Sequence, residues 1–119
     1  MEKIVSQYLK TGGRGPFREW LLALRDVKAR AKIRARLARA RAGNIGDSKA
    51  LGGGIYEMRV DFGPGYRVYF GQGGAESIVL LCGGDKSEQE RDVETAREYW
   101  ADYLERKNEP DSRLPRGLD

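Results

Sequence analysis

The hydrophobic pattern of this chain changes its period at the glycine-rich stretch GNIGDSKALGGG, residues 43–54. Before this stretch apolar residues recur at helical spacing, and after it they alternate with polar residues in two short runs. A period of 3.6 residues is typical of amphipathic helices, and a period of two is typical of strands with one buried face. The pattern therefore predicts an α+β fold.

One strand and two helices are predicted before the change of period. The run KIVSQYL, residues 3–9, is rich in strand-forming residues, and Pro16 suits the first turn of a helix. Asp26 is a suitable N-cap for a second helix, which begins near Val27 and ends at Gly43. The apolar face predicted for the first helix consists of Phe17, Trp20, Leu21 and Leu24.

The second helix combines a narrow apolar stripe with a strongly positive remainder. Ile33 and Leu37 belong to the stripe, and Arg and Lys occupy most other positions. Such a surface is suited to a nucleic-acid backbone, and its candidate contacts are Arg30, Arg34, Arg36, Arg39 and Arg41. A solvated helix face and an acidic protein partner are the alternatives.

Three strands and a helix are predicted after the glycine-rich stretch. Residues 55–62 alternate in polarity, which predicts a half-buried strand, and a turn at residues 63–65 leads to a second alternating strand. The apolar run SIVLLC, residues 77–82, is predicted to lie centrally in the sheet. The side chains expected opposite the core face of the hairpin are Arg59, Arg67 and Tyr69.

The last predicted helix completes a single domain, residues 1–108. Ser87 and Glu90 match a capping box at its start. Its predicted buried side consists of Val93, Ala96, Trp100 and Leu104. The order is strand, helix, helix, strand, strand, strand, helix, with a mainly antiparallel sheet packed against the helices. Residues 109–119 are expected to form a flexible tail.

The composition excludes several kinds of chemistry. Histidine is absent and Cys82 is the single cysteine, so Cys-His catalysis and an internal disulfide are excluded. Cys82 lies in an apolar run and is expected to be a small buried residue. Scattered carboxylates disfavour metal catalysis, and no cofactor is expected. Because no apolar run approaches the roughly 18 residues of a membrane span, we expect a cytoplasmic protein.

The charge is distributed unevenly along the chain. Residues 1–87 contain 16 Lys and Arg against 8 Asp and Glu, whereas residues 88–119 contain 6 against 10. A basic body of this kind favours an anionic partner, most simply nucleic acid.

Arg59, Arg67 and Lys86 are candidates for metal-independent chemistry on RNA. Cleavage of a phosphodiester by its 2′-hydroxyl requires a stabilised phosphorane, and guanidinium groups suit phosphate oxygens. The groups available for proton transfer are Lys86, Asp85, Glu57 and Tyr69. The alternative is that Arg59 pairs with Glu57 or Asp61 while Arg67 is a solvated surface charge, and spacing alone favours it.

The turn GGDKS presents Asp85 and Lys86 near the start of the last helix. Its glycines permit unusual backbone conformations, so the turn is suited to hold a phosphate. An ordinary connection between strand and helix explains the same residues, and the spacing of a P-loop is absent.

Three segments together resemble the RelE/ParE superfamily of toxins, specifically its addiction-module killer or HigB-like branch. They are FREWLLALRD, GNIGDSKALGGGIYEMRVDFGPGYRVYF and LLCGGDKS, and the resemblance extends over residues 17–104. It implies a small sheet flanked by two N-terminal helices and one C-terminal helix.

The resemblance implies an mRNA endonuclease that acts in the ribosomal A site and inhibits translation. Arg67 matches the family arginine, Lys86 matches the basic residue after the last strand, and Arg59 falls near a lysine of RelE. Glu57 stands near the position of a second RelE lysine. The further candidate substrate contacts are Lys49, Arg30, Arg34, Arg41, Tyr69 and Asp85.

The partners implied by the resemblance are a cognate antitoxin, the ribosome and mRNA, with oligomers formed through the antitoxin complex. The ParE branch gives a different possibility, inhibition of DNA gyrase by binding. A third possibility is an inactive member that binds only the antitoxin or nucleic acid.

Overall fold

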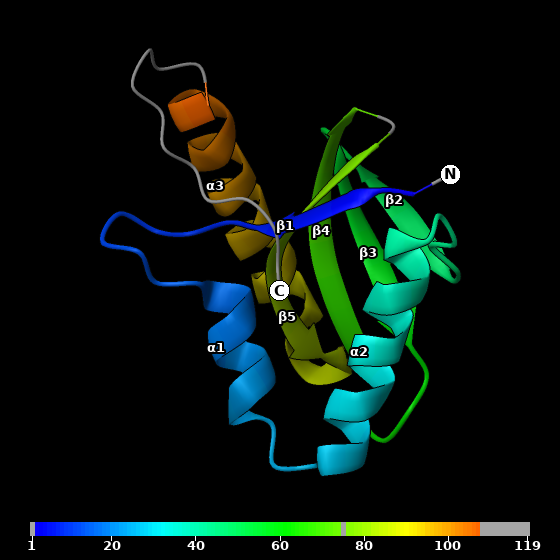
Figure 1. Ribbon diagram of the computed structural model, residues 1–119. Coiled ribbons are helices and arrows are strands. Elements are labelled where there is room, and N and C mark those ends of the chain that lie inside the picture. The colour runs from blue at the N-terminus through cyan, green and yellow to red at the C-terminus, as the bar shows by residue number, and fades with distance from the viewer. Residues whose placement is uncertain (1, 75, 108–119) are drawn as a thin grey trace.

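The computed structural model describes residues 2–74 and 76–107. Its elements follow one another as shown in Figure 1. They are β1 (Ile4–Gln7), α1 (Pro16–Ala23), α2 (Val27–Arg41), β2 (Ser48–Gly52), β3 (Ile55–Val60), β4 (Tyr66–Gly74), β5 (Ser77–Asp85), the short 3-10 helix η1 (Lys86–Glu88) and α3 (Gln89–Lys107).

The five strands form one mixed sheet in the order β1-β5-β4-β3-β2. β1 is parallel to β5, and the other neighbouring pairs are antiparallel. The prediction of an α+β domain is confirmed. β5 is an interior strand, as its apolar sequence predicted, although β4 occupies the middle of the sheet.

The two N-terminal helices cover one face of the sheet (Figure 1). The Asp26 carboxylate accepts hydrogen bonds from the backbone N–H groups of Lys28 and Ala29, which confirms the predicted cap of α2. The core between these helices and the sheet includes Phe17, Leu21, Ile33, Leu37, Met58, Val68 and Phe70. The predicted helical stripes therefore face the predicted strand face.

The opposite face of the sheet is covered by α3, so the prediction of a half-buried hairpin is wrong. A second core lies there, formed by Tyr8, Ile55, Tyr69, Val79, Leu81, Cys82, Ala96 and Trp100. The ring of Trp100 packs on Gly71, while the ring of Trp20 packs on Gly83. Most residues of β3 and β4 are therefore buried on both faces, and the polar residues that are buried there need partners.

β2 lies within the stretch that the sequence assigned to a glycine-rich connection. Lys49 is opposite Glu57 in its antiparallel pairing with β3, and the register shifts between Ala50 and Gly52. This segment lacks the β-branched residues typical of strands. Its strand conformation follows from backbone pairing with β3, which an alternation of side chains cannot reveal.

The start of the last helix also differs from the prediction. Asp85 caps η1, because its carboxylate accepts hydrogen bonds from the backbone N–H and hydroxyl of Ser87. The predicted capping box is therefore wrong, because the capping side chain is that of Asp85 and not that of Ser87. Ala96 and Trp100 are buried as expected, whereas Leu104 is exposed. The predicted tail, residues 109–119, lies outside the described residues.

Candidate functional site

Arg59 and Arg67 are directly opposite each other in the antiparallel pair of β3 and β4. Two residues further along the same pair of strands, Glu57 is opposite Tyr69. Directly paired residues share a face, and residues two apart on a strand share it too. The predicted grouping of Arg59, Arg67 and Tyr69 on one face is therefore confirmed, but α3 covers part of that face.

Glu57 is the centre of this group, with an exposed fraction of only 1%. One carboxylate oxygen accepts a hydrogen bond from Nη1 of Arg67 at 3.1 Å, and the other accepts one from Nε2 of Gln89 at 2.8 Å. Nε of Arg59 is 3.9 Å from the first oxygen. A buried carboxylate of this kind requires such partners, because burial removes its hydration.

The two arginines differ in exposure. The side chain of Arg67 is 12% exposed and that of Arg59 is 42% exposed. Arg59 also lies 3.6 Å from a carboxylate oxygen of Asp47. The suggested pairing of Arg59 with Glu57 is thus observed, whereas Arg67 is not the solvated charge that the alternative required.

Tyr69 is fully buried, so its assignment as a substrate contact is wrong. Its hydroxyl has no hydrogen-bond partner among the described residues. Burial, followed by the nearby negative charges of Glu57 and Asp92, raises the pKa of Tyr69 well above its ordinary value. The phenol therefore stays protonated near neutral pH.

Lys86 directly follows the last residue of β5 and is exposed. It lies near the turn between β3 and β4. A Cβ atom placed on Gly65 would lie 3.8 Å from Cβ of Lys86. The carboxylate of Asp85 caps η1, and its hydrogen bonds with Ser87 lower the pKa of this carboxyl group. Lys86 is therefore the accessible member of this turn, and Asp85 has a structural role.

Lys49 belongs to the same face, because it is opposite Glu57 on the neighbouring strand β2. Its side chain is exposed. Together, Lys49, Arg59, Arg67 and Lys86 place positive charge around the end of the sheet where α3 begins. The structure therefore brings four of the predicted site residues into one region.

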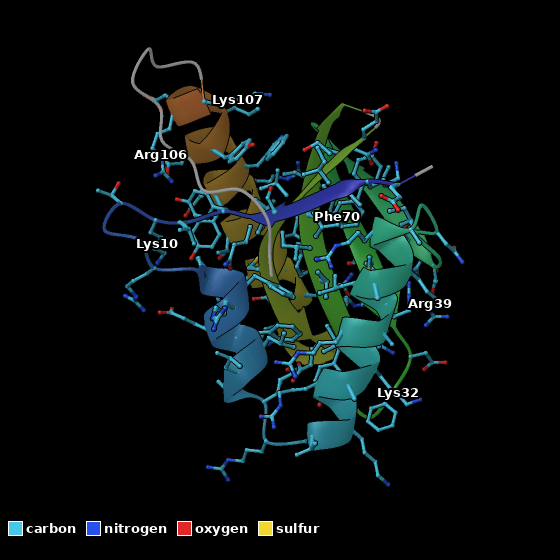
Figure 2. All side chains as sticks on the ribbon, in the orientation of Figure 1. Lys10, Lys32, Arg39, Phe70, Arg106 and Lys107 are labelled. Carbon is cyan, nitrogen blue, oxygen red and sulfur yellow. The ribbon has the colours of Figure 1, made fainter. Side chains whose placement is uncertain are left out.

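The predicted contacts on α2 lie on the other side of the sheet. Arg30 is half-buried and donates a hydrogen bond to the carbonyl oxygen of Leu24 at 2.8 Å. Arg34 and Arg41 line a groove between α1 and α2. Figure 2 shows Lys32 and Arg39 on the side of α2 that faces away from α1. One small ligand therefore does not contact α2 and Arg67 together.

Gln89 and Asp92 are absent from the predicted site residues, yet both lie at the site. Gln89 holds Glu57, and a Cβ atom on Gly84 would lie 2.0 Å from a carboxylate oxygen of Asp92. Burial, followed by the charge of Glu88, raises the pKa of Asp92. Gln89 extends the stripe of Val93 back by one turn, and this spacing was the available signal.

The described residues contain no group of three or more His, Cys, Asp or Glu that could hold a metal ion. Cys82 is buried as predicted, and burial raises the pKa of its thiol to about 12. The thiol therefore stays protonated near neutral pH and is a poor nucleophile. No helix in the described part of the chain has the length and apolar character needed to cross a membrane.

No family model matches the sequence. The chain is 47% identical over 81 residues to an uncharacterized protein of Haemophilus influenzae. The matched region covers 68% of this chain and 82% of that protein. The chain therefore belongs to the same protein family as this Haemophilus influenzae protein.

Proposed function

We propose that this chain is the toxin of a type II toxin-antitoxin module, with a RelE/ParE-like fold and a ribosome-dependent mRNA endonuclease activity that inhibits translation. The resemblance of three sequence segments to that superfamily supports the proposal. The arrangement of two N-terminal helices, a sheet and a C-terminal helix agrees with the fold that the resemblance implies.

The observation that carries the proposal is the direct opposition of Arg59 and Arg67. Like charges directly opposite each other on neighbouring strands destabilise a sheet. Glu57 lies within 4 Å of both guanidinium groups and offsets part of their repulsion. Asp47, 3.6 Å from Arg59, offsets a further part. The two adjacent guanidinium groups are suited to the oxygens of a phosphate group, which supports an anionic substrate at this position.

The chemistry assigns a role to each basic group. The 2′-oxygen of a ribose attacks the adjacent phosphorus while the bond to the 5′-oxygen breaks, giving a 2′,3′-cyclic phosphate. Arg67 stabilises the phosphorane through Nη2, since Nη1 donates to Glu57 and Nε is buried. Arg59 positions the message, and Lys86 stabilises charge on the leaving oxygen.

Two proton transfers accompany this reaction. The attacking hydroxyl loses a proton, and the leaving 5′-oxygen gains one. Tyr69 is excluded by its burial, and Asp85 is occupied by its cap. Glu57 is excluded by the same criteria, because it is 1% exposed and both of its oxygens accept hydrogen bonds, so its role is to position Arg67. In this proposal the exposed ammonium group of Lys86 donates the proton to the leaving 5′-oxygen, and water accepts the proton of the attacking hydroxyl.

A cell-free translation reaction tests the proposal. The purified chain is expected to cut a defined message when ribosomes translate it and to leave the same message intact when initiation is blocked. An intact message in both reactions contradicts the proposal. Cleavage of naked message at the same rate contradicts the ribosome dependence.

A binding protein is the second candidate, and the burial of Arg67 and Glu57 favours it. Their side chains are 12% and 2% exposed, so a substrate reaches them only at their edges. In this proposal the chain inhibits DNA gyrase without cleaving RNA, or binds only an antitoxin. Blocked supercoiling by purified gyrase with intact message identifies the first of these activities, and binding of an antitoxin without either effect identifies the second.

A further inference from the structure

A groove lies between α1 and α2, on the side of the sheet away from Arg67. We call it the α1–α2 groove. Its volume is about 330 Å³. The apolar lining consists of the buried Phe17, Leu21 and Leu37 and the exposed Leu22 and Ala38. The charged lining consists of Arg18, Arg34 and Arg41. The groove therefore combines a hydrophobic floor with a basic rim.

Leu22 extends the apolar surface of the groove outward. It lines the groove and is 51% exposed, whereas Phe17 and Leu21 of the same helix are buried. Single exposed leucines are common, but one beside an apolar groove adds to a continuous hydrophobic surface. A partner that covers Leu22 gains the free energy of burying it.

The charges of Arg18 and Arg34 are not balanced by the other residues that line the groove. None of the described residues that line it is acidic, and α2 contains no Asp or Glu from Val27 to Arg41. The acidic residue of α1, Glu19, is bonded to Arg14 instead. Within the described part of the chain, Arg18 and Arg34 form no salt bridge. The rim therefore attracts carboxylates of another molecule.

We propose that the α1–α2 groove binds an amphipathic, acidic helix of a partner protein. A groove between two helices accepts apolar side chains that recur at three and four residues on a third helix. Glutamate or aspartate at the margins of that helix pairs with Arg18 and Arg34. Shape, apolar floor and charge then select the same kind of ligand.

The composition of the floor disfavours RNA as the occupant. Bases bind by stacking on exposed aromatic faces or by hydrogen bonds to polar groups. Phe17 is fully buried, and Leu21 and Leu37 offer no polar atoms. Phosphates would contact the rim alone and leave the apolar floor uncovered.

The position of the groove has a consequence for the proposed nuclease site. The sheet separates the groove from Arg67, so a helix bound in the groove leaves the region of Arg59, Arg67 and Lys86 uncovered. The partner and an anionic substrate are therefore expected to bind at the same time. The groove proposal does not depend on the nuclease proposal, because it requires only binding.

Selection of helical peptides tests the groove proposal. A display library of 16-residue peptides is selected on the full chain. Binding is then compared with the variant Ala38→Trp, which places an indole in the groove, and with Ala35→Trp, which changes an exposed residue of α2 outside it. Selected peptides are expected to be acidic, with apolar residues three and four apart, and to lose at least about tenfold in affinity for Ala38→Trp alone.

A charge reversal provides the second comparison. Arg34→Glu is expected to weaken the selected peptides at least about tenfold, while Arg39→Glu, outside the groove, has a smaller effect. Equal binding to Ala38→Trp and Ala35→Trp overturns the proposal. The proposal is also overturned if a 12-nucleotide single-stranded RNA binds wild type and does not bind Ala38→Trp. That result would identify nucleic acid as the occupant of the groove. Circular dichroism confirms that each variant is folded.

Discussion

Glu57 accepts a hydrogen bond from Arg67 at 3.1 Å, and Gln89, the first residue of α3, donates to its other oxygen at 2.8 Å. The pair is almost entirely removed from water, with 2% and 12% of the two side chains exposed. Burying such a pair costs desolvation energy that its attraction only partly recovers. The pair is therefore better explained by the placement of Arg67 than by stability alone.

Removing one partner of this pair is expected to be costly. Glu57→Ala leaves the guanidinium of Arg67 without its carboxylate, so the free energy of unfolding should fall by about 3 to 5 kcal/mol. The double variant Glu57→Gln and Arg67→Gln should lose less than the sum of the single changes. Urea denaturation of wild type, Glu57→Ala, the two single glutamine variants and the double variant measures both quantities.

The exposed pair of Glu88 and Arg91 provides the matched control. These side chains are 52% and 74% exposed, so Glu88→Ala should cost less than about 1 kcal/mol. Equal losses for Glu57→Ala and Glu88→Ala would show that burial adds nothing to the Glu57 pair. Additive losses in the double variant would show that Glu57 and Arg67 are not coupled.

Gly71 is expected to tolerate no side chain, because Trp100 packs directly on it. A Cβ atom at Gly71 would lie 2.2 Å from the indole. Gly71→Ala should therefore lower the free energy of unfolding by about 2 kcal/mol, through displacement of the ring. Gly74→Ala on the same strand has nothing within 4 Å and should change it by less than about 0.5 kcal/mol. Thermal melting compares the two, and similar changes would refute the close packing.

Asp92 is expected to make stability depend on pH. Burial raises its pKa above the ordinary 3.8, so the folded state holds this proton more tightly than the unfolded state does. Stability from the protonated form is present below about pH 3 and is lost as the pH rises through the raised pKa. Asp92→Asn should therefore gain stability over wild type at about pH 7 and not at about pH 3. A difference that is the same at both pH values contradicts this assignment.

The faces of the hairpin could be predicted from the sequence, because the alternation of Val68 and Arg67 follows from strand geometry. The covering of the second face could not, since Arg67 and Glu57 are residue types found mostly in water. A clue was present in β5, which is apolar on both sides. A strand of that kind needs helices on both faces of its sheet, and α3 supplies the second layer.

The sequence pattern also could not predict that the basic residues lie on two sides of the sheet. Arg34 and Arg67 both belong to the basic part of the chain, and charge counts treat them alike. In the structure the sheet lies between them, so they belong to different surfaces of the protein. The partner of Glu57 on α3, Gln89, is 32 residues away in sequence, a distance at which local spacing carries no information.

In the nuclease proposal, Arg67 and its neighbours act on a message held by the ribosome. Primer extension on a translated message measures this directly, with wild type, Arg67→Gln, Arg59→Gln, Lys86→Gln and the control Arg25→Gln, which changes an exposed residue between α1 and α2. Wild type and Arg25→Gln should give cuts at A-site codons, and folded Arg67→Gln should reduce them at least about 100-fold. Undiminished cutting by folded Arg67→Gln, or an uncut message with wild type, would contradict the nuclease proposal.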